Sequence, residues 1–448
     1  MEELIPVKGE VVKVSRQARE FISKETISGV LLVIAALIAI LWANSPWAES
    51  YHHVWHEINI EFAIGNWFDL DASLNHWIND GLMAIFFFTV GLEIKREVME
   101  GELSSIKKAS LPIMAAVGGM VFPALIYVAF NFDNPLTSKG WGIPMATDIG
   151  FALGVLALLG DRVSINLKIF LTALAIADDL GAIMVIALFY TDPASIDFAQ
   201  LWTALAFVVV LLGANKIGIR SGTFYGVVGL FGVWVAFVYS GIHATFAGVL
   251  IALTIPARAK IKGTEFILKA RRLRRKFVKN PVEGELLSPE QTEAVAGMEK
   301  ILEEIQTPLQ KLEHTIHPFV AYVVLPLFAL SNAGVHISGK MVDLLFDPVA
   351  LGVIVGLVFG KFLGVVIVSK IMVALRISDL PQNVNWPEIY GVGMLAGIGF
   401  TMSIFISDLA FDDVSIIEKA KIGVMAATLI SSVTGILILK WYYNKPDS

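Results

Sequence analysis

Two adjacent aspartates, Asp178 and Asp179, lie in the middle of an apolar run that extends over about 165–190. A helix needs roughly 20 residues to cross a bilayer, so this run is long enough. A carboxylate at the centre of such a helix costs roughly 2.5–3.5 kcal/mol on insertion scales. Ionisable residues at that depth usually face protein or water, so the pair marks a candidate functional site.

Asp148 and Lys361 are two further ionisable residues at similar depth in other apolar runs. A structural salt bridge needs one aspartate and the lysine, and it leaves two carboxylates over. The excess of negative charge suits a cation site, whereas the competing interpretation is buried polar contacts between helices. Because Asp178 and Asp179 are neighbours on one helix, they point about 100° apart. One can pair with Lys361 while the other faces a cavity, and spacing does not say which.

The backbone around these residues is unusual in two places. The run Met145–Phe151 and the run Met394–Phe400 share Met, Ile, Gly and Phe at matching positions, and the second is rich in glycine, a weak helix former. Interrupted helices at corresponding places of two halves are typical of transporters built from inverted repeats. Asp148 and Lys361 could then neutralise the half-helix ends. Chance similarity between two glycine-rich segments is the alternative.

The composition predicts the elements that hold these residues. The 448-residue chain is 56% hydrophobic and 17% charged, with a mean hydropathy of +0.70, and it contains no cysteine. This composition predicts an all-α polytopic membrane protein. Without cysteine, the chain can have neither a disulfide framework nor a thiol metal site. We expect about twelve transmembrane helices, two of them broken and crossing, at about 27–44, 76–94, 109–130, 141–160, 165–190, 198–214, 221–240, 242–256, 315–335, 349–375, 389–410 and 415–439.

The basic residues predict the orientation of the chain. With a cytoplasmic N-terminus, 29 of the 34 Lys and Arg fall in segments on the inner side. Both termini are therefore expected in the cytoplasm, and residues 1–26 lack the pattern of a secretory signal. The expected division is an N-terminal segment 1–26, spans 1–8 over 27–256, a cytoplasmic loop 257–314, spans 9–12 over 315–440 and a tail 441–448.

Two segments outside the spans carry their own signals. Alternating apolar residues around Gly65-Asn66 predict a small extramembrane β-hairpin at about 58–70 with a two-residue turn, which a second copy of the chain could extend. His52, His53 and His56 nearby are either a metal site or solvated surface. The loop 257–314 contains the basic run 271–276, which either binds anionic headgroups or anchors the topology. A capped helix is expected from Ser288, lying on the protein or membrane surface.

The chain resembles bacterial sodium/proton antiporters of the NhaA type from about Ile27 to its C-terminus. This resemblance is carried by Asn79-Asp80-Gly81-Leu82-Met83-Ala84, Val90-Gly91-Leu92-Glu93-Ile94-Lys95-Arg96-Glu97, Ala146-Thr147-Asp148-Ile149-Gly150-Phe151-Ala152-Leu153-Gly154, Ala177-Asp178-Asp179-Leu180-Gly181-Ala182-Ile183, Ser240-Gly241-Ile242-His243-Ala244-Thr245 and Gly397-Ile398-Gly399-Phe400-Thr401-Met402-Ser403-Ile404-Phe405. Inverted repeats are a stated property of that family. Two departures are a longer 257–314 loop and Phe362 after Lys361, where proline is expected.

The resemblance implies residue roles. Asp179 with Asp178 would bind Na⁺ or Li⁺ and the competing protons, and Lys361 would pair with Asp178. Asp148 and Thr147 would lie at the crossing of the broken helices, and Asp80 would act on the outer side. The pH response would involve His243, Glu93, Glu313, His314 and His317. The hairpin would join two protomers.

The expected function is exchange of cytoplasmic Na⁺ or Li⁺ for external H⁺ by alternating access across the bacterial inner membrane. It would be electrogenic and pH-regulated, with membrane lipid around it and no cofactor, enzymatic chemistry or nucleic-acid partner. A sodium-coupled symporter of an organic solute is the alternative. An intramembrane aspartyl hydrolase is disfavoured because Asp178 and Asp179 share one helix, although Asp148 could complete a pair. A channel is disfavoured by a midplane lysine.

Overall fold

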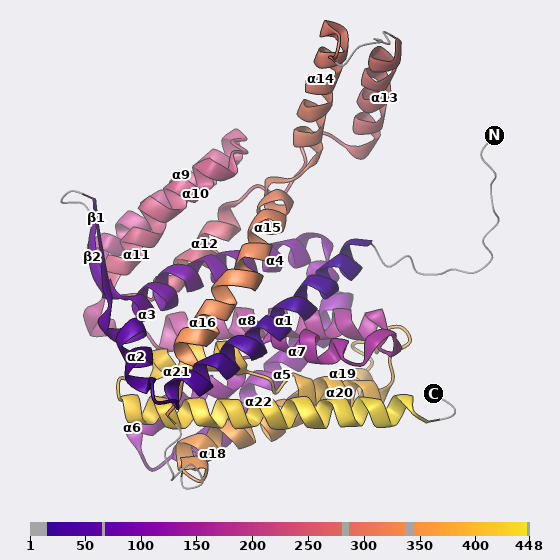
Figure 1. The fold of residues 1–448 in the computed structure, drawn as a ribbon. Coiled ribbons are helices and arrows are strands. Elements are labelled where there is room, and N and C mark those ends of the chain that lie inside the picture. The colour runs from indigo at the N-terminus through magenta and orange to yellow at the C-terminus, as the bar shows by residue number, and fades with distance from the viewer. Residues whose placement is uncertain (1–15, 65–67, 280–285, 337–343, 446–448) are drawn as a thin grey trace.

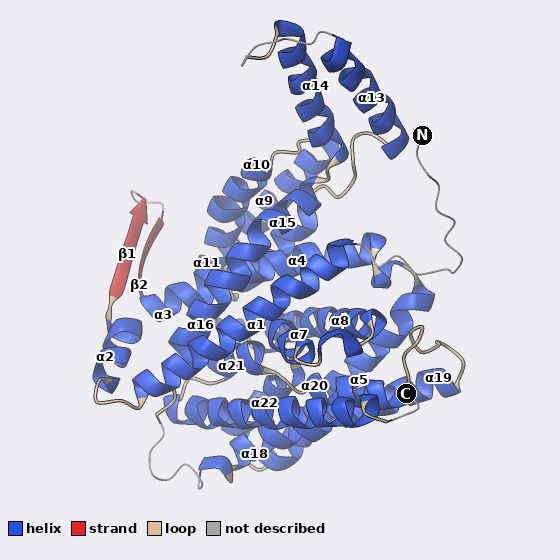
Figure 2. Ribbon diagram, turned by 45° about the vertical axis from the view of Figure 1, so that its right-hand side comes forward, coloured by secondary structure: helices blue, strands red, loops and turns tan. Residues whose placement is uncertain are grey.

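The computed structural model describes residues 16–64, 68–279, 286–336 and 344–445, and most of that length is helical (Figures 1 and 2). Five long uninterrupted helices are α1 (Arg16–Ala43), α5 (Ile106–Asn131), α8 (Ile165–Phe189), α9 (Phe198–Ile217) and α22 (Val414–Tyr443). Four other long helices each contain one π-helical turn, which widens the helix locally. They are α3–α4 (Leu74–His76 and Met83–Glu100), α10–α11 (Gly222–Val228 and Val235–Ser240), α15–α16 (Pro308–Phe319 and Leu325–Asn332) and α18–α19 (Pro348–Val355 and Lys361–Ala374).

Two helical pairs are bent where the sequence predicted broken helices. The 3₁₀ segment Lys139–Met145, preceded by α6 (Pro135–Ser138), meets α7 (Ile149–Ala157) at 47°. The helix α20 (Trp386–Leu395) meets α21 (Phe400–Ala410) at 43°. The remaining helices are α2 (Ala48–His52), α12 (Thr245–Thr254), α13 (Gly263–Lys279) and α14 (Pro289–Ile305).

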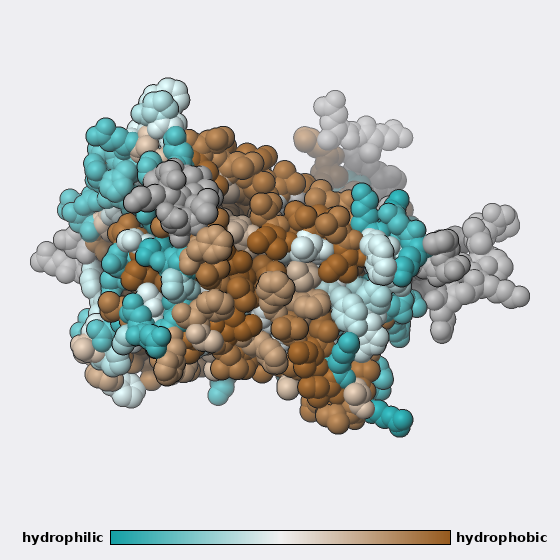
Figure 3. All heavy atoms as spheres, turned by 90° about the horizontal axis from the view of Figure 1, so that it is seen from below, coloured by the Kyte–Doolittle hydropathy of each residue, from teal (hydrophilic) through white to brown (hydrophobic). Residues whose placement is uncertain are grey.

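The helices form a membrane-spanning bundle. Among the described residues, eight helices are long and apolar enough to cross a bilayer, and the two bent pairs raise this number to ten. Two shorter apolar helices, Ile27–Ala43 and Thr245–Thr254, occupy the other two predicted spans. Whether both cross the membrane, and whether the two halves are inverted repeats, stay predictions. Figure 3 shows apolar side chains in a broad band across the middle of one face, with polar side chains at either end.

The two ends of the bundle differ. The β-hairpin lies at one end, here called the hairpin end, while the start of α1 and the end of α22 lie at the opposite end, here called the terminal end (Figure 1). The strands β1 (Asn59–Ile64) and β2 (Phe68–Ser73) pair antiparallel, as predicted. Ile64 pairs with Phe68, so three residues connect the strands and the predicted two-residue turn was wrong. These residues, 65–67, lie outside the described part of the chain.

The 257–314 segment folds as a helical hairpin of α13 and α14, and both views show it projecting from the bundle (Figures 1 and 2). The predicted cap at Ser288 is confirmed: its hydroxyl accepts from the Gln291 amide at 3.2 Å, and the Gln291 side chain accepts from the Ser288 amide at 3.1 Å. The helix ends at Ile305, and the next span already begins at Pro308 rather than near 315. Thr307 caps the start of α15, because its hydroxyl accepts a hydrogen bond from the amide of Gln310 at 3.1 Å.

Small residues set the distance between the helices that carry the site. A Cβ added to Gly364 of α19 would lie 2.1 Å from the carbonyl oxygen of Gly118 in α5, and one added to Gly118 would lie 2.5 Å from that of Gly364. The two backbones therefore touch at these glycines, as in other membrane helix pairs packed through small residues. This contact holds the start of α19, and hence Lys361, beside the centre of the bundle.

Candidate functional site

Asp178 and Asp179 lie near the middle of α8, and both are buried, with exposed fractions of 0% and 2%. Ser164 starts this helix, because its hydroxyl accepts from the amide of Leu167 at 3.2 Å. Oδ1 of Asp178 and Oδ1 of Asp179 are buried and accept no hydrogen bond within the described part of the chain. Buried polar atoms are rarely left in that state without a ligand, an ion or water nearby.

Lys361 neutralises one aspartate of the pair. Its ammonium group is fully buried and donates to Oδ2 of Asp178 and, at 2.9 Å, to the hydroxyl of Thr147. The lysine is the first residue of α19, directly after the π-helical turn Gly356–Gly360. Both partners of this ion pair are removed from water, so each depends on the other for its charge. The structure thus resolves the question that spacing left open: Asp178 faces Lys361, and Asp179 does not.

The two broken helices meet at their breaks. The amide of Asp148 donates to the carbonyl of Ile398 at 2.7 Å, and the hydroxyl of Thr147 donates to the carbonyl of Ala396 at 2.8 Å. Gly399 lies close to the other break, because a Cβ there would lie 3.1 Å from the carbonyl oxygen of Ala146. The expected crossing at Asp148 and Thr147 is therefore present in the fold.

Asp148 caps two half-helices at once. Its Oδ1 accepts from the amide of Phe151 at the start of α7, at 2.9 Å. Its Oδ2 accepts from the amide of Thr401 at the start of α21, at 3.1 Å, and from the hydroxyl of the same residue. Both contacts satisfy donors at helix starts, where the helix dipole favours a negative charge. Thr401 lay within a motif of the sequence, but its bond to Asp148 was not predicted, since it depends on the two breaks meeting.

A small cavity lies beside Asp179 and Asp148 in the interior of the bundle. Its volume is about 40 Å³, room for about three water molecules. Polar groups in its wall come from five helices or their starts, and they offer carboxylate, hydroxyl and imidazole groups. They are Thr89, Glu93, Thr147, Asp148, Asp179, His317 and Thr401. Oxygen-rich surroundings of this kind suit a hard cation such as Na⁺ or Li⁺.

Four of the five predicted pH-response residues divide into three groups. Glu93 and His317 line the cavity, with 3.9 Å between Oε1 and Nε2. Glu313 binds Arg96, which also contacts Glu97 at 3.1 Å. Arg96 lies in the motif Val90–Glu97, but that motif does not reveal that Glu313 is its partner. His314, in contrast, is exposed and contacts neither the cavity nor these ion pairs.

His243 and Asp80 lie away from the cavity. The His243 ring is 3.0 Å from the carbonyl oxygen of Tyr190, and Asp80 contacts His76 at 3.2 Å from a π-helical turn. The sequence analysis missed His76, although its spacing of four residues from Asp80 places both side chains on one face of a helix.

The three histidines near the hairpin do not form a cation site. No group of three or more possible metal ligands occurs in the described residues. His52 and His53 contact Glu57 instead, at 3.2 and 2.8 Å. The hydrogen bonds from His53 and His52 hold the pKa of the Glu57 carboxyl below its usual range. Of the two interpretations, solvated surface is therefore the better supported.

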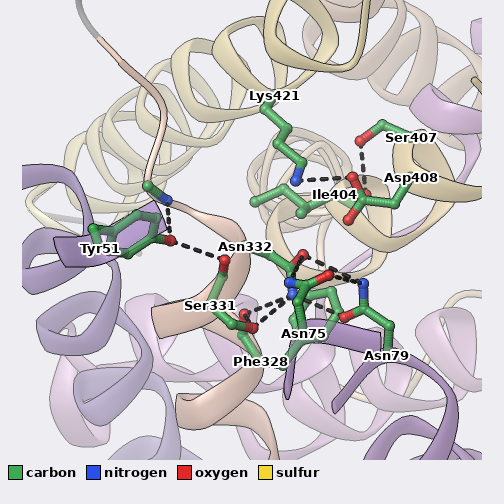
Figure 4. A network of polar contacts seen from close by, with 11 residues as sticks. Tyr51, Asn75, Asn79, Phe328, Ser331, Asn332, Ile404, Ser407, Asp408 and Lys421 are labelled. Atoms are coloured by element: carbon green, nitrogen blue, oxygen red, sulfur yellow. Dashed lines mark hydrogen bonds and ion pairs between the residues drawn. The ribbon is translucent and has the colours of Figure 1, made fainter. Parts of the chain in front are cut away.

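A polar network that the sequence did not reveal lies at the hairpin end (Figure 4). Asn332 of α16 donates to Oδ1 of Asn79 at 2.9 Å and accepts from Asn75 at 3.2 Å. Beside it, Lys421 of α22 contacts Asp408 of α21 at 2.8 Å. These contacts join α16 to the start of the α3–α4 helix and α21 to α22.

Comparison with known proteins places this site in a family. The family model described as "Na+/H+ antiporter 1" matches residues 19–439. The chain is 48% identical to a protein named Na(+)/H(+) antiporter NhaA from Oleidesulfovibrio alaskensis, over 94% of this chain and 93% of that protein. It is 45% identical to Na(+)/H(+) antiporter NhaA 2 from Syntrophotalea carbinolica, over 94% and 95%.

Among solved structures, the sodium proton antiporter MjNhaP1 from Methanocaldococcus jannaschii aligns over 96% of this chain and 99% of that one. Its identity is 12% and the TM-score is 0.46, a likeness too low to support an assignment. The family match and the curated relatives span nearly the whole chain and do not need that support. The chain therefore belongs to the Na+/H+ antiporter 1 family.

Proposed function

We propose that the protein exchanges Na⁺ or Li⁺ for H⁺ across the membrane and that Asp179 is the carboxylate that both ions share. The observation that supports this is the buried Oδ1 of Asp179, which accepts no hydrogen bond from the described residues and stands at the wall of the cavity. A buried carboxylate without a partner is stabilised by a bound cation or by a proton. Since the two cannot occupy it together, each displaces the other.

The neighbouring residues have distinct parts in this proposal. Lys361 and Thr147 hold Asp178 while Asp179 is protonated. When the cation binds, Asp178 turns from Lys361 toward it, and the released ammonium group can give up a proton. More protons than sodium ions then cross the membrane in each cycle, and this difference makes the exchange electrogenic. Asp148 keeps the two half-helices in place and lends a carboxylate to the wall.

Access alternates between the two ends of the bundle. In the described conformation Glu93 and His317 line the cavity, whereas the residues of the asparagine network do not. We take the terminal end as cytoplasmic, in agreement with the distribution of Lys and Arg. Glu93, Glu313, His314 and His317 then form the inner mouth that responds to pH, and Asp80 and His243 act on the outer side.

The test is exchange by Asp179→Asn in proteoliposomes. Because asparagine carries neither a charge nor a titratable proton, ²²Na⁺ uptake driven by a pH gradient should fall to the level of empty vesicles. Asp133→Asn is the matched control, since Asp133 is an exposed aspartate outside the site. Robust uptake by Asp179→Asn would refute the assignment.

Family membership and the size of the cavity favour exchange over sodium-coupled symport of an organic solute. Pockets for small organic molecules usually enclose about 300–1,000 Å³, whereas this cavity encloses about 40 Å³. The curated relatives carry antiporter names rather than the names of enzymes. Asp178 is paired with Lys361 and both oxygens of Asp148 cap helix starts, so neither is a free carboxyl that could join Asp179 in an aspartyl hydrolase.

We further propose that the protein lies in the bacterial inner membrane as a homodimer joined through its β-hairpin. A lone two-stranded sheet is marginal in water, and Ile58, Ile60 and Phe62 are exposed on or next to β1. Replacing residues 59–73 with a short Gly-Ser linker should shift the particle from dimer to monomer in chromatography with light scattering. The ends can be joined, because the Leu74 amide donates to the Ile58 carbonyl at 3.0 Å. A particle that still has the mass of a dimer after this replacement would exclude the hairpin as the contact between protomers.

A further inference from the structure

The helical hairpin of α13 and α14 has one basic arm and one acidic arm. Leu273 marks the face of α13 that packs on α14, since it fills the space beside Gly297, where a Cβ would meet the leucine at 2.8 Å. Lys269 and Lys276 flank this face and contact Glu304 and Glu293 of α14, at 3.6 and 2.5 Å. The lysines on the inner face are therefore neutralised within the hairpin.

Four arginines of α13 are not neutralised. All four are exposed, and none makes an ion pair or hydrogen bond with another residue in the described part of the chain. They are Arg271, Arg272, Arg274 and Arg275. Arg271 and Arg275 are two positions from Leu273, about 200° around the helix, so they point directly away from α14. Arg272 and Arg274 are one position from Leu273 and flank that outward face.

Large apolar side chains share the outward face. Ile267, Leu268 and Val278 are exposed by 49%, 67% and 64%. Their helical positions fall between those of the arginines, on the side opposite Leu273. Guanidinium groups interleaved with exposed apolar side chains on one helix face are typical of helices that lie in the headgroup region of a membrane.

The base of the hairpin is fixed to the bundle. Arg220, just before α10, donates to the carbonyl of Arg258 and to that of Gln306, both at 2.8 Å, and so holds both legs. The legs also bond each other, through the Lys260 amide to the Glu304 carbonyl at 2.9 Å. Only two residues separate α14 from α15, the helix that carries Glu313 and His317.

We propose that the outward face of α13 binds anionic lipid headgroups of the membrane that holds the protein. The charge and the apolar side chains match such a surface, and the tether keeps the helix next to it. A tethered surface acts at high effective concentration, so even a modest affinity per residue gives substantial occupancy. A soluble polyanion or the acidic arm of a second copy would have to reach the same face from solution.

The test uses the absence of cysteine from the whole chain. A single cysteine at Val278→Cys is labelled with a polarity-sensitive dye, and the intact protein is placed in nanodiscs of phosphatidylcholine alone or mixed equally with phosphatidylglycerol. The dye emission should shift to the blue in the anionic nanodiscs and return in molar salt, which screens the headgroups. A label at Ala296→Cys, exposed on α14, should not change.

A variant with all four arginines changed to Gln should lose the shift, with affinity falling roughly fivefold per arginine. The matched control changes four exposed lysines outside the hairpin to Gln: Lys107, Lys108, Lys216 and Lys440. Equal emission in both lipids, or a shift that survives in the four-arginine variant, would overturn the proposal. A shift produced by polyphosphate in detergent would also overturn it, since the occupant would then be a soluble polyanion. A shift in phosphatidylcholine that grows with protein concentration would overturn it too, since the occupant would then be a second copy of the chain. None of these readings depends on ion exchange.

Discussion

At the scale of single residues, two neighbouring aspartates have different surroundings because a helix turns by about 100° per residue. Asp178 meets Lys361 and has its charge balanced inside the protein, while Asp179 meets the cavity. The same step of the helix therefore separates a carboxylate in an ion pair from the carboxylate that we propose the exchanged ions share. Thr147 belongs to both parts, since it binds Lys361 and lines the cavity.

Lys361→Gln tests the ion pair. Removing one partner leaves a buried carboxylate without its counter-charge, which typically costs about 3–5 kcal/mol. We therefore expect the apparent melting temperature of the purified protein to fall clearly, as followed by intrinsic fluorescence in detergent.

The double variant Lys361→Gln with Asp178→Asn is the control for this prediction. It removes both charges, so it should recover part of the lost melting temperature. If the double variant melted no higher than Lys361→Gln, the loss would come from packing around the lysine stem rather than from the unpaired charge.

At the scale of elements, the site depends on close approach of backbones. The contact of α5 with α19 at Gly118 and Gly364 holds Lys361 in place, and the contact of the two breaks holds Asp148. Side chains would keep these segments apart. The glycines in these apolar segments therefore serve packing, although each weakens its own helix.

Gly364→Val should abolish exchange and lower the melting temperature, because its Cβ would lie 2.1 Å from the backbone oxygen of Gly118. Gly213→Ala is the matched control in α9, where a Cβ meets nothing within 4 Å. That change should be neutral or stabilise the protein by up to about 1 kcal/mol, since alanine is the better helix former. Normal exchange by Gly364→Val would show that the close approach is dispensable.

The sequence predicted the elements better than their contacts. Apolar length and the two Gly-rich motifs located every long helix and both breaks, since these depend on nearby residues. The partners of Arg96 and Thr401 depend on helices more than 200 residues away in the chain, so no local pattern could reveal them. The start of α15 at Pro308, rather than near 315, was missed because it is set by the cap at Thr307 and not by the apolar run that follows.

At the scale of the whole molecule, an apolar band covers the middle of the face shown in Figure 3, and a small cavity with polar groups lies inside. Exchange then reduces to competition for one site reached in turn from either end. The apparent KM for Na⁺ should rise on acidification on the side of binding, by up to about tenfold per pH unit for each proton that competes with the ion. Initial rates over a grid of Na⁺ concentration and pH measure this, with a fluorescent pH indicator inside vesicles. A falling maximal rate at constant KM would point to a separate regulatory site.

The cavity beside Asp179 is too small for a fully hydrated alkali ion. An entering ion must therefore strip off much of its water, and oxygen atoms of the wall must replace the lost ligands. That exchange of ligands favours compact cations, whose oxygen contacts are short, over a wider ion such as K⁺. Discrimination between ions would then arise from dehydration at the cavity wall, before any movement of the helices begins.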